Sequence, residues 1–279
     1  MNHHLITLTV ILPLLGGLLQ AFVPSVKGAS TGAVAKWIAL LSSLAASFFG
    51  IALVLSMQAL NPDLQFTETL PWVGSYAISY DMGIDGLNAL LILLVSIVFP
   101  VLIAYEWNQK IATRGMHGLF LILQASFFGA VCAQDLFLLF FFWGMSAFPL
   151  YFLIGIWGGD GREVAAFRFM IAASVGGALM FGAMILIYHS VDPHTFLIRE
   201  LSRGQLTGKT FPLLGREYSL PGVAFALIAI GLAFRGPIWP FQGWFTRVAK
   251  EAPSTVFVAA SAVSMPVAKI GRASCRERV

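Results

Sequence analysis

The sequence predicts an all-α integral membrane protein of about eight transmembrane helices. Of its 279 residues, 58% are hydrophobic and 11% are charged, against roughly 25% charged residues in typical soluble domains. Runs such as 35–58, 87–105 and 164–188 carry too few charges to face water, and a helix that crosses a bilayer needs about 20 mostly apolar residues. Because these runs do not alternate as barrel strands do, we expect them to span as helices.

Eight hydrophobic windows, each bounded by charges, glycine or proline, mark the expected helices. In chain order they span residues 5–23, 35–58, 87–106, 116–133, 136–157, 164–189, 221–236 with a continuation after Pro240, and 253–270. The first window could instead be a signal peptide, but it lacks a basic start and a small-x-small cleavage site. We therefore interpret it as a membrane helix.

Charge and cysteine content exclude several classes of function. The formal net charge is +4, but no basic run with interleaved aromatic residues suggests a nucleic-acid partner. Cys132 and Cys275 are the two cysteines, which is too few for a disulfide framework or a Cys-x-x-Cys metal site. We expect no cofactor, no metal and no nucleic acid, and a lipid bilayer as the immediate environment.

The basic residues of the short loops predict the orientation, because cytoplasmic loops collect lysine and arginine. Alternate loops hold the basic residues Lys27, Lys36, Lys110, Arg114, Arg162, Arg168, Arg247 and Lys250. The opposite short loops hold the acids Asp63, Glu68, Asp81, Asp85 and Asp135 and no basic residue. We expect the N-terminus on the non-cytoplasmic side, although the longer loop near 190–220 is basic and departs from the pattern.

The chain changes character after residue 270. Residues 271–279 bring three arginines and a glutamate where the preceding apolar run had no reason to stop. A cytoplasm-like tail is one explanation, but the loop pattern puts this end on the other side of the membrane. We interpret residues 271–279 as a non-native tail that replaces the true continuation.

An arginine lies inside the apolar seventh window, next to a break. Arg235 is followed by Gly236, and Pro237 and Pro240 each remove a backbone donor and crowd the preceding turn. We therefore expect the helix to be interrupted over 236–240. Arg235 would lie about 22 Å along it at 1.5 Å per residue. It could face an interior polar cavity, as in broken transporter helices, or extend its side chain to the membrane interface.

Two further charged residues stand at helix ends. Lys269 would lie deep in the membrane if the eighth helix continues past 270, where a lysine can serve as a proton carrier; otherwise it reaches the interface. Asp85 precedes a long apolar run, and we expect it to cap the N-terminus of the third helix.

Several motifs together point to one family. They are residues 83–87, 135–143, 149–158, Arg162 with 165–169, Pro237, Pro240, 243–244 and 251–255. The combination resembles the antiporter-like membrane subunits of NADH:quinone oxidoreductase (respiratory complex I), and is most similar to the M-type chain, called subunit 4 in mitochondria. The resemblance covers nearly all of 1–270. Its fifth-helix motif separates M-type chains less well from hydrogenase membrane subunits and Mrp-type antiporters.

The resemblance implies a fourteen-helix fold with two inverted five-helix repeats, each containing a broken helix. It maps residues 116–270, helices four to eight, onto the first repeat and leaves 1–115 as helices one to three, so the second repeat is missing. It also implies proton translocation coupled to quinone reduction elsewhere, in the cell inner (plasma) membrane. The partners would be other membrane subunits of a complex I-like assembly, with quinone handled by neighbouring subunits.

Three positions depart from the family pattern. The family has a glutamate after the fifth-helix tryptophan and a lysine before the broken helix, where this chain has Gly144 and Arg235; Gln242 replaces a family histidine. Gly144 carries no proton, and an arginine effectively never loses one. By their positions in the family pattern, Lys269 and Arg235 are the proton-path candidates, but only Lys269 matches the family residue unchanged. We expect Arg235 to be structural, bound by carbonyls or by an acid of a neighbouring subunit.

Three functions remain open. The chain could be a complex I-like membrane subunit without a redox centre of its own, or a hydrogenase or Mrp-type cation/proton antiporter subunit. It could also be a non-conducting structural spacer, as the changes at Gly144 and Arg235 suggest. Genomic neighbours would separate the first two.

Overall fold

The computed structural model describes residues 4–22, 29–58, 63–107, 109, 113–192, 194–201, 206, 208–213, 216–236 and 238–264. Its helices are α1 (Leu5–Phe22), α2 (Ala29–Leu55), α3 (Gly86–Glu106), α4 (Arg114–Cys132), α5 (Leu136–Met145), α6 (Ala147–Trp157), α7 (Arg162–Ser190), α8 (Ile198–Glu200), α9 (Leu220–Arg235), α10 (Gly243–Glu251) and α11 (Ser254–Ala259). Its strands are β1 (Gln65–Val73), β2 (Ile78–Ile84), β3 (Thr210–Leu213) and β4 (Arg216–Ser219). Pro237, Lys269 and the tail 271–279 lie outside the described residues.

Six apolar stretches in the described part are long enough to cross a membrane. They are Leu5–Phe22, Ala33–Leu55, Gly86–Glu106, Arg114–Cys132, Leu136–Trp157 and Arg162–Ser190. The expected all-α membrane fold is confirmed, and each of these spans matches one of the first six helices expected from the sequence. The seventh expected helix is the shorter apolar α9 followed by α10, and the described part of the eighth consists of α11 and a π-helical turn, Ala260–Ser264.

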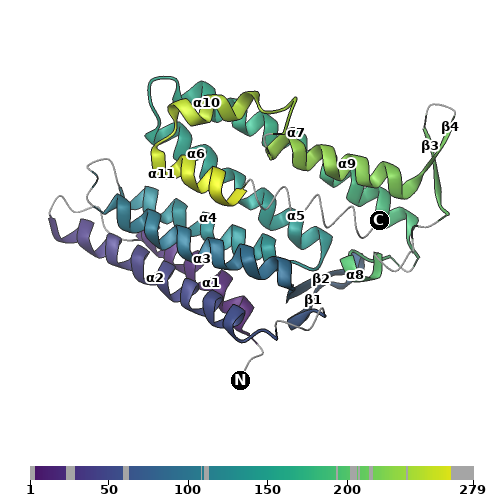
Figure 1. The fold of residues 1–279 in the computed structure, drawn as a ribbon, viewed down its shortest axis with the longest axis horizontal. Coiled ribbons are helices and arrows are strands. Elements are labelled where there is room, and N and C mark those ends of the chain that lie inside the picture. Colours follow the sequence, from purple (N-terminus) through teal and green to yellow (C-terminus); the bar gives the residue numbers. More distant parts are fainter. Residues whose placement is uncertain are drawn as a thin grey trace.

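The helices form two packed groups joined by α5 and α6 (Figure 1). Helices α1 to α4 pack against one another; α5 and α6 contact α4 on one side and α7 on the other. Helix α9 packs along α7, while α10 covers the first half of α7 and α11 contacts α3 and α6. This arrangement places the end of α9 beside α5.

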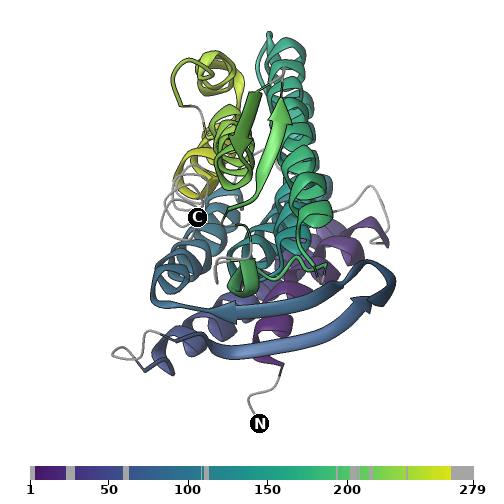
Figure 2. The same ribbon diagram turned by 90° about the vertical axis from the view of Figure 1, so that its right-hand side faces the viewer.

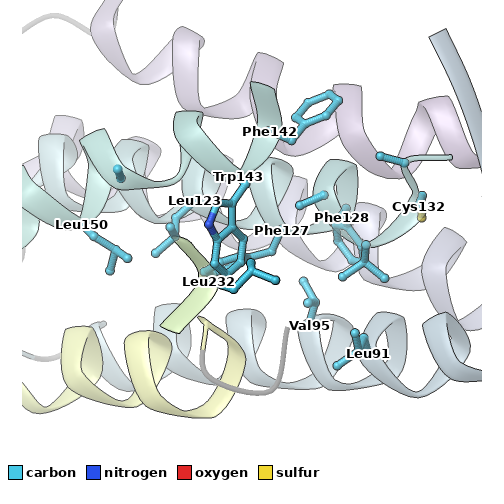
Figure 3. Packing of buried hydrophobic residues seen from close by; sticks show 14 of the residues in the cluster. Leu91, Val95, Leu123, Phe127, Phe128, Cys132, Phe142, Trp143, Leu150 and Leu232 are labelled. Atoms are coloured by element: carbon cyan, nitrogen blue, oxygen red, sulfur yellow. The ribbon is translucent and has the colours of Figure 1, made fainter. Parts of the chain in front are cut away.

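The core of the bundle is aromatic. Phe99, Phe120, Phe127, Phe128 and Phe169 are among the largest fully buried side chains. Figure 3 shows the indole of Trp143 among Leu123, Phe127 and Leu232, which come from α4 and α9. Because lipid tails are as apolar as these side chains, close van der Waals packing holds such helices together.

The closest helix approach in the second group joins α7 and α9. A Cβ added at Gly176 would lie 2.5 Å from the carbonyl oxygen of Gly231, and one added at Gly231 would lie 2.7 Å from that of Gly176. Only glycine allows two backbones to meet in this way. The contact fixes α9 on α7 one turn before Arg235.

A long β-hairpin was not expected from the sequence, where 63–85 read as a loop. Strands β1 and β2 pair antiparallel and run across the helix ends near the N-terminus (Figure 2). The Glu68 carboxylate accepts hydrogen bonds from the backbone N–H groups of Ile6 (2.9 Å) and Thr7 (3.2 Å), so the hairpin closes the first turn of α1. The expected cap of α3 is confirmed, because Asp85 Oδ1 accepts from the N–H groups of Leu87 and Asn88 at 3.1 and 2.8 Å.

Candidate functional site

The helix expected over 136–157 is divided at Ser146 into α5 and α6. The physical cause is Pro149, whose ring crowds the carbonyl of the residue four positions earlier and which lacks an N–H to bond it. That residue is Met145, the last of α5. Ser146 turns its hydroxyl back onto the carbonyl of Trp143 at 2.8 Å. The span is kept, but backbone carbonyls at its midpoint become available to other groups.

The seventh helix is broken at the expected place. Helix α9 ends at Arg235, whose successor Gly236 closes the last turn with a 2.7 Å hydrogen bond to the carbonyl of Leu232. Pro240 lies in the turn before α10 starts at Gly243. The indole N–H of Trp244 donates to the carbonyl of Phe234 at 2.7 Å and so satisfies one oxygen freed by the break.

Arg235 joins the two breaks. Its side chain is 3% exposed, so it lies inside the described bundle. The Nη1 donates to the carbonyl of Trp143 and the Nη2 to the hydroxyl of Ser146. The guanidinium carbon lies 4.4 Å from the centroid of the Trp143 ring, a cation–π contact. The sequence left two positions open for the Arg235 side chain, the bundle interior and the membrane interface. The structure shows the interior one.

The neighbours of Arg235 are neutral. We expected carbonyl partners, and one is present, but it belongs to Trp143 of α5 and not to the broken seventh helix itself. No carboxylate of the described residues lies within ion-pairing distance of the guanidinium. An ion pair elsewhere, between Arg199 and Asp81 at 3.2 Å, joins α8 to the hairpin. The site therefore buries a positive charge against dipoles and an aromatic face.

Gly144 stands beside this contact, between Trp143 and Ser146 in the sequence. A Cβ added at Gly144 would meet no atom of the described residues within 4 Å. The position where the family has a glutamate is thus free to accept a side chain. Lys269 and Pro237 cannot be placed relative to the site, because they lie outside the described residues.

Asp135 holds the start of α5 in place. Its Oδ1 accepts from the N–H groups of Phe137 (2.8 Å) and Leu138 (3.2 Å), and its Oδ2 accepts from the N–H of Ser79 at 3.2 Å. Burial raises the pKa of the Asp135 carboxyl, while these hydrogen bonds oppose the rise. In the sequence, Asp135 stands out as a loop acid and as the first residue of the 135–143 motif, but its capping role was not foreseen; its position before an apolar run was the signal for a cap.

The role of Ser146 also went unnoticed in the sequence. The available signal was Pro149, which marks a break one turn earlier. Within the described residues, no three histidine, cysteine or acidic side chains gather as a metal site.

The fold and the two adjoining helix breaks define a multi-pass α-helical membrane protein with discontinuous helices at its centre, an arrangement that transporters use to build polar sites. Residues 133–275, just over half of the chain, match the family described as NADH:quinone oxidoreductase/Mrp antiporter, TM. The chain belongs to this family.

Relatives and solved structures agree with this assignment. The chain is 28% identical over 275 residues to NADH-quinone oxidoreductase subunit M of Rhodobacter capsulatus, covering 96% of this chain and 52% of the relative. It is 28% identical over 257 residues to F(420)H(2) dehydrogenase subunit M of Methanosarcina mazei, covering 89% and 48%. The chain thus spans about half the length of these relatives.

Two solved assemblies contain the same fold. A chain of respiratory complex I from Thermus thermophilus with bound NADH superposes with a TM-score of 0.76 at 20% identity, covering 98% of this chain and 55% of that one. A chain of the Mrp complex from Dietzia sp. DQ12-45-1b gives 0.74 at 19% identity, covering 95% and 27%.

The contact between Ser146 and Arg235 can be tested with a double-mutant cycle. Ser146→Ala leaves a buried N–H of a charged group without its acceptor and should lower the free energy of unfolding by about 1.5–3 kcal/mol. In the Arg235→Met background the same change should cost little, because no charged donor remains. Thermal unfolding in detergent measures the effect of Ser146→Ala in both backgrounds.

The matched control for this cycle is Ser126→Ala. Ser126 is also buried, and its hydroxyl bonds the carbonyl of Ile122 within α4, away from Arg235. Its effect should be the same in both backgrounds. Equal effects of Ser146→Ala with and without Arg235 would contradict the contact.

Proposed function

We propose that this chain is part of a proton-translocating membrane subunit of an NADH:quinone oxidoreductase-like respiratory assembly. The supporting observation is the family match over 133–275 together with the likeness to a subunit M along 96% of the chain. In this proposal residues 116–270 supply the first five-helix repeat, 1–115 the three helices before it, and 271–279 a non-native tail. The electron-transfer reaction takes place elsewhere in the assembly.

The partners in this proposal are other membrane subunits and the lipid of the plasma membrane, and neighbouring subunits handle quinone. Many large apolar side chains point outward from the spans, among them Leu41, Phe48, Leu90, Val101 and Phe167, which are 58–68% exposed. Such side chains suit contact with lipid tails or with the helices of a neighbouring subunit.

Purification from native membranes tests the assembly. The tagged full-length protein should bring down NADH:quinone oxidoreductase subunits, and deletion of its gene should lower NADH-driven acidification of inverted membrane vesicles. Complementation with the intact gene is the control. Recovery of hydrogenase subunits, or of Mrp antiporter subunits with unchanged NADH-driven acidification, would replace this proposal with the corresponding alternative.

A non-conducting spacer is the second candidate, and Gly144 with Arg235 favours it. Gly144 has no titratable side chain, and the Arg235 guanidinium is held by a carbonyl, a hydroxyl and an indole ring. An arginine keeps its proton under these conditions. Proton passage along this route would then require side chains that the chain lacks.

Restoring those side chains should separate a conducting subunit from a spacer. Gly144→Glu with Arg235→Lys places two adjustable charges beside each other, and the open space at Gly144 accommodates the longer side chain. In the assembled complex in vesicles, proton flux per NADH oxidised should rise if the rest of the path is intact. Gly144→Gln with Arg235→Lys is the uncharged control, and unchanged flux in both would mean that the path is interrupted elsewhere as well.

We also propose that the N-terminus faces away from the cytoplasm. Contacts bring the described ends of several basic loops together. Lys36 donates to the carbonyl of Trp107, and the N–H of Gly159 donates to the carbonyl of Glu251 at 2.8 Å. A Cβ added at Gly115, at the start of α4, would lie 3.6 Å from the Trp157 ring at the end of α6. The β1–β2 hairpin, with its acids, lies at the opposite end of the spans, against the start of α1. This separation supports the positive-inside assignment.

Single cysteines report this orientation. In a background with Cys132→Ala and Cys275→Ser, Tyr76→Cys in the hairpin turn should react with a membrane-impermeant maleimide on intact cells. Asp160→Cys, in the loop between α6 and α7, should react only after the membrane is opened. Both positions are exposed, so the opposite labelling pattern would reverse the orientation.

A further inference from the structure

The buried charge of Arg235 lacks a counter-ion among the described residues. The side chain is 3% exposed, and its Nε, which is also buried, has no hydrogen-bond partner in the described part of the chain. The acceptors that it does have, the carbonyl of Trp143 and the hydroxyl of Ser146, are neutral. Within a membrane protein an uncompensated ionised group is costly, so such groups pair or neutralise.

An open space lies beside the guanidinium. Gly144 directly follows Trp143 and precedes Ser146 by two positions; it is half-buried, and no atom of the described residues lies within 4 Å of a Cβ added there. One turn earlier on α5, the Phe140 ring packs against α7, with a centroid distance of 5.7 Å to Phe181 and an edge 4.0 Å from a Cβ at Gly177. Gly144 therefore faces the next turn of α7, near Ala173.

Arg235 lies near the same turn of α7 as Gly144. Helices α7 and α9 touch at Gly176 and Gly231, and α9 begins near the end of α7, where Lys209 next to it bonds the carbonyl of Ser190. The two helices are therefore antiparallel. One turn beyond their contact, Arg235 comes level with Ala172. Small residues thus line the space on α5 and α7.

We propose that a small monovalent anion, with chloride as the physiological candidate, binds to Arg235 in the space between α5, α7 and α9 beside Gly144. The anion accepts hydrogen bonds from the guanidinium and supplies the negative charge that the described side chains do not. Bromide and nitrate have similar size and charge and should bind the same site.

Anion-dependent thermal unfolding tests this site on the full-length protein in detergent. At constant ionic strength and with one cation, replacing gluconate by chloride or bromide should raise Tm by roughly 3 °C or more, and the rise should saturate with halide concentration. Arg235→Met should abolish the halide response. Arg168→Met, which removes an exposed arginine of α7, should leave it unchanged.

A built-in carboxylate should replace the anion. Gly144→Glu places its charge in the same space, so its Tm in gluconate should equal or exceed that of the unmodified protein in chloride, without a further halide response. Gly144→Gln fills the space without a charge and should remain less stable than Gly144→Glu.

Three results would overturn the proposal. One is an equal Tm of the unmodified protein in gluconate, chloride and bromide, which requires no variant to fold. Another is a halide response that persists in Arg235→Met, which would place the anion elsewhere. The third is an undiminished halide response in Gly144→Glu.

Discussion

The guanidinium of Arg235 bridges the two places where the helices of this bundle are broken. Helix ends carry carbonyls without intrahelical partners, and inside a bilayer water is not available to bond them. At the break between α5 and α6 the carbonyl of Trp143 receives bonds from both Ser146 and Arg235. At the break after α9, Trp244 bonds the carbonyl of Phe234. At each break, a side chain from the far side of that break or from the other broken helix donates a hydrogen bond to a free carbonyl.

This bridge depends on how closely α9 approaches its neighbours. The touching backbones at Gly176 and Gly231 hold α9 against α7, and α7 in turn lies against α5 and α6. A side chain in place of either glycine would push α9 outward and carry Arg235 away from Trp143. A steric requirement in the middle of two apolar helices therefore determines an electrostatic contact one turn away.

The sequence was sufficient for the spans and for the break after Arg235, because apolar length and paired prolines act locally. It was not sufficient for the depth of Arg235, since a distance of about 22 Å along a helix is compatible with an interior or an interfacial side chain. The contact with Trp143 on another helix decides that question. The break at Ser146 was readable from Pro149, but membrane helices often tolerate proline without breaking. The hairpin was missed although its turn contains Gly74, because the left-handed position of that turn is taken by Ala77, at a φ of 52°.

The hairpin also has a consequence for the order in which the chain is built. The first turn of α1 is completed by Glu68, which lies 62 positions after Ile6. When α1 is made, the acid that will satisfy its N–H groups has not yet been synthesised, because the chain must first pass through α2 to return to the same end of the bundle. The hydrogen bonds at the start of α1 therefore form only after the hairpin that precedes the third span has been made. During biogenesis the first helix is thus completed by a segment synthesised much later.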